Sequence, residues 1–153
     1  MSAFRLPRLH RLTGADWRLL GEALPTLVWA SLAIAFLPFR RVAAAASLPS
    51  GQAARDDRDE ARKIAWAVNA WARRVPWRAV CFQRGLAAHR MLRRRGYESV
   101  LHYGVAQEEA KGLSAHVWVS LDGRTVIGGE EAPRFACLAT FPPEGGEAAA
   151  PTA

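Results

Sequence analysis

The hydrophobic pattern of this chain changes its period at Gly96, and that change constrains the fold more than any other feature. Apolar residues before Gly96 recur at helical spacing, whereas those after it alternate as in strands. Asp122-Gly123 interrupts the alternation with a pair typical of a two-residue hairpin turn. The pattern predicts an α+β fold, with helices first and a small antiparallel sheet after them. Strands are expected over residues 100–105, 115–121, 124–127 and 135–141.

The last helix before this change is predicted to run from about Ala79 to a glycine stop at Gly96. Three arginines, residues 93–95, occupy its last turn. Cations stabilise the carbonyl end of a helix dipole, which is a sufficient reason for their position. The alternative interpretation is an anion site or a docking surface for an acidic partner. The apolar face of this helix is expected to comprise Phe82, Leu86, Ala87, Met91 and Leu92.

Two further helices are predicted upstream. Thr13-x-x-Asp16 resembles a capping box, so one helix should begin near Gly14. Another should begin among acidic residues around Asp57 and end at Arg73 and Arg74, a charge order that suits the dipole. Residues 45–52 are expected to be a linker. We therefore divide the chain into an N-terminal helical segment that is a candidate partner-docking region (residues 1–52), a catalytic core (residues 53–141) and a disordered tail (residues 142–153).

The apolar run over residues 23–39 contains no charge and could be read as a membrane segment. It is shorter than the roughly 20 residues a span needs, and Pro25 and Pro38 punctuate it. Arg40 and Arg41 lie between the run and the small residues that follow, which is the wrong order for a secretory signal. We predict a packed or partner-binding helix rather than a membrane contact or a signal.

Composition restricts the remaining possibilities. At 153 residues and 50% hydrophobic content, the chain is expected to be one domain with a substantial core. The net charge of +7 favours acidic partners, although no nucleic-acid recognition motif accompanies it. Two cysteines indicate neither a disulfide framework nor a zinc site, and they fit a reducing, cytoplasmic location. With no P-loop signature, neither ATP use nor any other cofactor is expected.

Cys81 is the candidate nucleophile because it stands at the start of the last helix. The unpaired N–H groups of a helix N-terminus favour a thiolate and can stabilise an oxyanion, each donor contributing about 3 kcal/mol. No Ser, Thr, Asp or Asn precedes Cys81 to cap these groups. The alternative is an inert core thiol, which is common for a lone buried cysteine.

His116 is the candidate general base, since its strand follows the cysteine-bearing helix and can lie against it. On this strand His116, Trp118 and Ser120 share one face. His89 is about 12 Å along the helix from Cys81, which excludes it as a partner. His102 is possible but has no supporting pattern.

The group that orients His116 is left open by the sequence. Asp122 lies about 20 Å down the strand and is better explained as a turn residue. Glu131 would lie diagonally across the hairpin, whereas Glu130 would reach His116 only through a bulge at the two glycines between. The candidates are Glu130, Glu131, a backbone carbonyl, or no group.

These features together resemble the transglutaminase-like domain of lasso peptide biosynthesis B2 proteins, the leader peptidases of those pathways. The resemblance is carried by Cys81 on a helix ending LRRRG, by YGV at residues 103–105, and by the AHVWV–DG hairpin. It extends over most of the chain to about Phe141. It implies a papain-like core in which the cysteine-bearing helix packs on a small antiparallel sheet.

The resemblance implies Cys81 as nucleophile and His116 as general base and acid. The family's third residue is an Asp about 12 positions after the histidine, where this chain has Gly128. The implied reaction is cleavage of one peptide bond between the leader and core of a precursor peptide. The implied partners are that precursor, a small separate leader-recognition protein, and a lasso cyclase that acts on the product.

Three other functions remain open at this point. An acyltransferase would use the same Cys–His pair with an amine acceptor. A non-catalytic basic binding module would keep Cys81 in the core. A nucleic-acid-binding protein is suggested by charge alone, and its affinity would depend steeply on salt.

Overall fold

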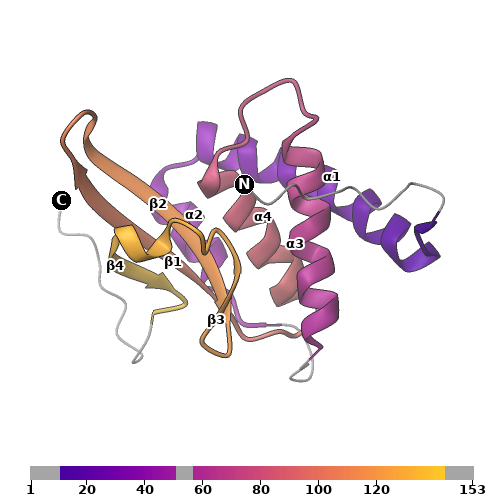
Figure 1. The fold of residues 1–153 in the computed structure, drawn as a ribbon. Helices are drawn as coiled ribbons and strands as arrows, with labels where there is room; N and C mark the ends of the chain where they lie inside the picture. The colour runs from indigo at the N-terminus through magenta and orange to yellow at the C-terminus, as the bar shows by residue number, and fades with distance from the viewer. Residues whose placement is uncertain (1–10, 51–56, 144–153) are drawn as a thin grey trace.

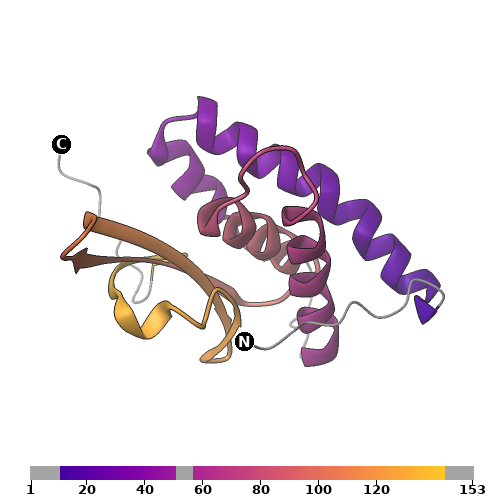
Figure 2. The same cartoon turned by 45° about the horizontal axis from the view of Figure 1, so that its top comes forward.

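The computed structural model describes residues 11–50 and 57–143, and the described chain forms a layer of helices beside one antiparallel sheet (Figures 1 and 2). The α+β prediction is confirmed, whereas residues 144–153 of the predicted tail lie outside the described residues. The elements in order are α1 (Gly14–Phe36), α2 (Phe39–Ala46), α3 (Arg58–Ala72), α4 (Cys81–Arg94), β1 (Ser99–Glu108), β2 (Gly112–Leu121), β3 (Arg124–Ile127), the short 3-10 helix η2 (Ala132–Arg134) and β4 (Ala136–Phe141).

α1 begins at the predicted capping box. Thr13 Oγ1 accepts from the Asp16 amide at 3.3 Å, and Asp16 Oδ2 accepts from the Thr13 amide at 2.9 Å. The helix continues through Pro25, so this proline does not interrupt the apolar run as expected. Buried contacts of α1 with α3 and α4 on both sides of Pro25 outweigh the lost backbone hydrogen bond.

The prediction that the apolar run is too short for a membrane span needs correction for this helix. α1 has 23 residues, and by length and composition alone it could cross a membrane. One third of its most apolar window is buried in the fold, and Ala23, Leu27 and Ala30 within it are completely enclosed. The predicted packing of this run is therefore observed for one face of α1.

The segment after α1 is more ordered than expected. α2 ends at Ala46, so the first two residues of the predicted linker are helical. Pro38 is the N-cap of α2 and thus does separate the two helices. Gly51 and Gln52, which complete the predicted linker, lie outside the described residues.

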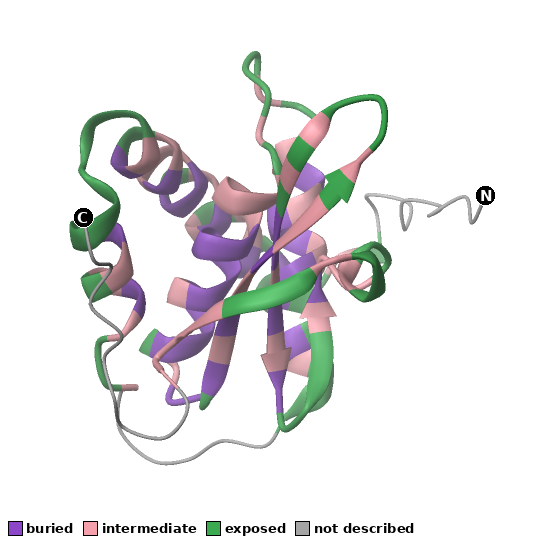
Figure 3. Cartoon of the chain, turned by 90° about the vertical axis from the view of Figure 1, so that its left-hand side faces the viewer, coloured by how far each residue is buried: buried purple, intermediate pink, exposed green. Residues whose placement is uncertain are grey.

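The four strands lie in the order β3-β2-β1-β4, and β1 and β2 form the long central hairpin. This hairpin runs further than expected, since β1 continues to Glu108 and leaves only residues 109–111 as a loop. Val117, Val119 and Leu121 are buried, and β2 packs with its neighbours against α4. Figure 3 shows the buried residues gathered where the helices face the sheet, whereas much of β4 is exposed.

A glycine brings α4 close to the sheet. A Cβ built at Gly85 would lie 2.8 Å from Cγ1 of Val117, which is too close for any side chain. Gly85 is one turn beyond Cys81, and Val117 follows His116 directly. The contact therefore fixes the start of α4 relative to the strand that carries the histidine.

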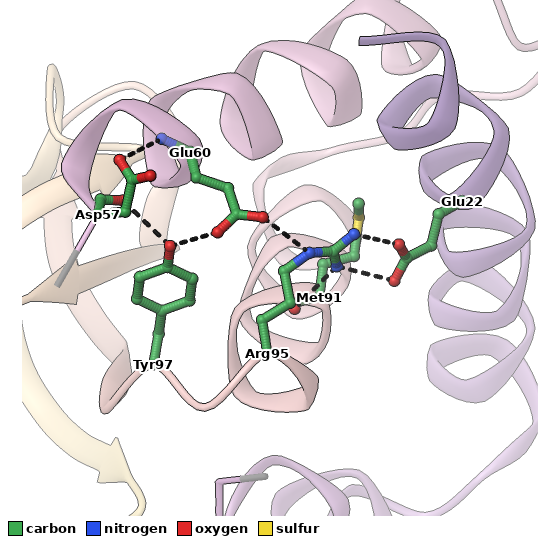
Figure 4. A network of polar contacts seen from close by, with 6 residues as sticks. All are labelled: Glu22, Asp57, Glu60, Met91, Arg95 and Tyr97. Carbon is green, nitrogen blue, oxygen red and sulfur yellow. Dashed lines mark hydrogen bonds and ion pairs between the residues drawn. The ribbon is translucent and has the colours of Figure 1, made fainter. Parts of the chain in front are cut away.

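The C-terminal end of α4 is held by a network of ion pairs (Figure 4). Arg95 Nη1 donates to Glu22 Oε1 of α1 at 3.0 Å, and Arg95 Nε lies 3.4 Å from Glu60 Oε1 of α3. The hydrogen bond with Glu22 raises the pKa of Arg95. Tyr97 OH donates to Glu60 Oε2. Arg95 thus ties three helices together at one point.

Arg93 is similarly engaged. Its guanidinium donates to the carbonyls of Leu48 at 2.8 Å and Ser99 at 3.4 Å, and it lies 3.3 Å from Glu98 Oε2. Within the described ranges, Arg94 is the exposed member of the triple arginine. Two of the three arginines therefore serve the fold, which favours the structural explanation of this cluster over an anion site.

Candidate active site

Cys81 is the first residue of α4, and its helix start is uncapped by any side chain in the described residues. The N-cap is Val80, whose amide donates to Gln83 Oε1 at 2.8 Å. The first intrahelical acceptor is the Val80 carbonyl, which binds the Arg84 amide at 3.2 Å. The N–H groups of Cys81, Phe82 and Gln83 consequently have no intrahelical partner and are available as donors.

Cys81 opens onto a cleft of about 1490 Å³ between the helices and the sheet. One wall comes from α3, the loop over residues 73–80 and the first turn of α4. The other comes from β2, β3 and the segment over residues 128–135. His116 lines this second wall, so the two predicted catalytic residues share one cleft.

His116 is buried, with 6% of its surface exposed. Its Nε2 lies 2.7 Å from the carbonyl oxygen of Gly128, and the ring is 5.0 Å from that of Phe135. Since a carbonyl only accepts, Nε2 must carry the proton that is donated to it. In the neutral imidazole Nδ1 is then the unprotonated nitrogen, which is the form a general base requires.

A backbone carbonyl therefore contacts His116 at the chain position where the resembled family has an Asp. Gly128 has φ of +79°, and a Cβ there would lie 2.7 Å from the Val117 carbonyl oxygen. Only glycine avoids both the strain and the clash. The absence of a side chain lets the backbone approach β2 closely enough to bind the imidazole.

The two glutamates considered from the sequence lie at the same cleft. Glu131 Oε2 is 3.9 Å from His116 Nδ1, an ion pair only when the imidazole is protonated. Glu130 is exposed on the cleft, and no contact with His116 is found for it within the described residues. For Glu130 to reach His116, the β2–β3 hairpin would need a bulge at Gly128 and Gly129. The pairing of β2 with β3 instead shifts register between Val119 and Ser120, so the irregularity lies before these glycines.

The thiol and the imidazole are not in hydrogen-bond contact. Within residues 11–50 and 57–143, the Cys81 thiol makes no hydrogen bond, while both His116 nitrogens lie near the groups described above. Catalytic hydrogen bonds are often long without substrate and tighten in the complex. The structure thus brings the two residues to one cleft but leaves the final approach open.

The other histidines have separate environments. His89 is buried between the Ala46 carbonyl, 2.7 Å from Nε2, and Ser99 Oγ, 2.9 Å from Nδ1. Burial lowers the pKa of His89 to about 4, so it is a neutral core residue. His102 stacks on Trp118 and lies 3.9 Å from the exposed Cys137 thiol, which makes it the neighbour of the second cysteine rather than of Cys81.

Sequence reasoning left a backbone carbonyl among the candidates that orient His116 but did not identify it as that of Gly128, although consecutive glycines after a strand were a usable signal. It missed the position of Arg84. Arg84 lines the cleft one turn from Cys81 but was read only as part of the helix. No group of three His, Cys, Asp or Glu residues suited to a metal ion occurs in the part of the chain that is described.

A cysteine at a helix start, with a histidine on a strand across the same cleft, is an arrangement that thiol hydrolases and transferases use. The chain matches the transglutaminase-like superfamily over residues 23–140, and it belongs to that family. The match includes most of α1 and extends nearly to the end of β4. No curated protein and no solved structure shows a significant match to the chain.

Proposed function

We propose that this protein is a cysteine peptidase that removes the leader from a ribosomally made lasso precursor peptide. The superfamily includes cysteine peptidases and acyltransferases. The leader-peptidase assignment is supported by the ordered motifs around Cys81, YGV and the AHVWV hairpin, which resemble lasso B2 proteins. A cytoplasmic location is part of the same proposal.

The observation that carries the proposal is the arrangement across the cleft. Cys81 stands at a helix start whose first N–H groups have no intrahelical partner. His116 lines the opposite wall with Nε2 on the Gly128 carbonyl, which leaves Nδ1 as its basic nitrogen. Gly128 provides the orienting acceptor for Nε2 that a catalytic carboxylate provides in a triad. A thiol acyl-transfer site requires a thiol, a base and oxyanion donors, and the presence of these candidate groups along one cleft supports the proposal.

The proposed reaction proceeds in two steps. His116 Nδ1 takes the thiol proton, and the thiolate attacks the carbonyl carbon of the last leader residue. The free N–H groups at the start of α4 stabilise the oxyanion, and His116 then gives its proton to the leaving amine of the core peptide. Water, deprotonated by His116, attacks the thioester, and the released leader carries the new carboxylate.

Leader recognition is assigned to a separate small protein. α1 exposes large apolar side chains on the face turned away from α3 and α4, with Leu32 and Phe36 exposed by 53% and 79%. An exposed apolar surface of this kind favours a protein partner. Leu32→Ser and Phe36→Ser should weaken association with the leader-binding protein in a pull-down. Unchanged association would show that this surface is not the docking site.

The test is mass spectrometry of a candidate precursor encoded beside the gene, incubated with this protein and the leader-binding protein. A single cut made by the wild type and by Cys137→Ala, but not by Cys81→Ala, is expected. The Cys137 variant is a demanding control because Cys137 and His102 form the other Cys–His neighbourhood. Loss of cutting in Cys137→Ala alone would overturn the assignment of the nucleophile.

Product mass separates the peptidase from an acyltransferase. Hydrolysis adds one water across the cleaved bond, whereas transfer leaves the leader joined to an amine. A leader product carrying an amine would replace the proposed peptidase by the transferase that uses the same pair.

A further inference from the structure

Arg84 is a cation in the cleft, one turn after Cys81, and no carboxylate among the described residues pairs with it. It is half-buried, and its Nε atom is buried with no hydrogen-bond partner in the described residues. Its one side-chain hydrogen bond there is from Nη1 to Asn69 Oδ1, at the long distance of 3.5 Å. A buried N–H group without a partner costs free energy, and the guanidinium that carries it has unused donors for a ligand.

The other engaged arginines of α4 show what a satisfied guanidinium looks like in this fold. Arg95 binds two glutamates, and Arg93 binds two carbonyls and a glutamate. Arg93 also has a buried Nε without a partner, but its other nitrogens are occupied. Within the described chain no ion pair is found for Arg84, although glutamates lie elsewhere along the same cleft.

The surroundings of Arg84 favour an anion. Of the charged side chains that line the cleft, seven are Arg or Lys and three are carboxylates. Asn69 Oδ1 accepts this hydrogen bond, so the Nδ2 group of the same amide is a further donor beside the guanidinium. A guanidinium and an amide N–H group together match the two oxygens of a carboxylate.

We propose that Arg84, assisted by Asn69, binds an acidic side chain of the substrate beside the scissile bond. The three-residue separation from Cys81 corresponds to about 4.5 Å along the helix axis. An extended peptide advances about 3.3 Å per residue, so the carboxylate belongs one or two residues from the attacked carbonyl. The inference rests on the proposed function, because it takes Cys81 as the nucleophile. It adds to that function a requirement for an acidic residue in the substrate near the cleaved bond.

The binding site is tested without any precursor, by alkylating the full-length protein with iodoacetate and with iodoacetamide. In both reactions Sγ forms a bond to the CH₂ carbon of the reagent and iodide is released. The reagents differ in charge, because iodoacetate carries a carboxylate and iodoacetamide a neutral amide. The ratio of their rates at Cys81 cancels the reactivity of the thiol itself. Peptide mapping also measures the ratio of the two rates at Cys137, which serves as an internal reference in the same molecule.

The rate ratio at Cys81 is expected to exceed that at Cys137 by about tenfold in the wild type, as for one charge-assisted contact. Arg84→Gln should abolish the excess, and Arg84→Lys should retain part of it. Arg94→Gln is the matched control, because it removes one exposed positive charge from the same helix outside the cleft. An equal ratio at both cysteines, or an excess that survives Arg84→Gln in a protein with unchanged circular dichroism, overturns the proposal.

Once a precursor is cleaved, a second measurement addresses the substrate. Replacing the acidic residue nearest the cut by its amide should raise KM about tenfold in the wild type and have no further effect in Arg84→Gln. Amidation of the precursor's C-terminus should change nothing, and an effect of that amidation instead would overturn the assignment to a side chain. If no precursor is cleaved but the iodoacetate preference at Cys81 is found, the peptidase proposal would be wrong and the carboxylate-binding site at Arg84 would still be supported.

Discussion

The two ends of α4 have opposite physical characters. At the C-terminal end, Arg93 and Arg95 are surrounded by carboxylates and carbonyls from three other segments. At the N-terminal end and within the described residues, the Cys81 thiol has no hydrogen bond, no side chain caps the N–H groups of the first turn, and Arg84 has no carboxylate partner. One end of the helix is saturated with partners and the other is left with unused donors.

This difference separates stability from function along a single helix. Charge pairs at the saturated end hold α1, α3 and α4 in fixed positions, so the unsaturated end is presented rigidly to the cleft. Unused donors at a helix start lower stability, because Ser or Asp caps there typically contribute about 1 kcal/mol. The comparison leads to four predictions, from the largest expected effect to the smallest.

Cys81→Ala should lower cleavage of the precursor by at least about a thousandfold, because the nucleophile is lost. The midpoint of thermal unfolding should change little, since Cys81 is only partly buried and its thiol makes no hydrogen bond in the described residues. Steady-state assays and thermal melts of this variant and Cys137→Ala would show both effects. A strongly destabilised Cys81→Ala would mean that the N-terminal end is also structural.

Gly128→Asp, which restores the resembled family's residue, should lower activity by about a hundredfold instead of raising it. The new side chain meets the Val117 carbonyl and would move the Gly128 carbonyl away from His116. Gly123→Asp is the control, because Gly123 also has a positive φ but a Cβ there would meet no other atom. Comparing the two variants separates the effect of backbone strain from that of the steric clash. Increased activity in Gly128→Asp would show that the backbone carbonyl is a poor substitute for the carboxylate.

Acid should destabilise the fold through His89, which belongs to the structural half of α4. Its pKa is lowered by burial from about 6.5 when unfolded to about 4 when folded, so the unfolded chain binds the proton first. The free energy of unfolding should therefore fall by about 3 kcal/mol as pH drops from 6.5 to 4. Denaturant titrations across this range should show a flatter profile for His89→Gln, and an equal slope in both proteins would contradict the assignment.

Arg95→Met should lower the free energy of unfolding by about 2 kcal/mol, because Glu22 and Glu60 lose their shared cation while partly buried. The specific activity of the folded fraction should stay unchanged. Arg94→Met, on the exposed side of the same turn, should have little effect on either quantity. A large activity loss in folded Arg95→Met would break the proposed division between the two ends.

Local sequence signals were sufficient for the elements themselves. The capping box at Thr13, the hairpin at Asp122-Gly123 and the change of period at Gly96 each depend on a few neighbouring residues, and each occurs as predicted. The continuous helix through Pro25 was not predicted, because burial against α3 and α4 is a tertiary effect. Strand lengths were also underestimated where pairing with a neighbour extends them beyond the hydrophobic pattern.

The candidate site divides in the same way. Cys81 and His116 could be selected as candidates from residue type, helix start and strand position. The contact of Gly128 with His116 could not be selected, since it depends on a positive φ and on close approach to β2. The isolation of Arg84 was equally hidden, because a sequence shows a charge but not whether another charge reaches it.

By itself, the sequence determined the α+β order of elements, the helix that carries Cys81 and the strand that carries His116, because helical and strand periods are local properties. Only the tertiary structure decided which arginines of α4 are paired, which backbone carbonyl holds the histidine and which side chains share the cleft. Those features depend on distances between segments far apart in the chain, and such distances are fixed only when the whole core packs.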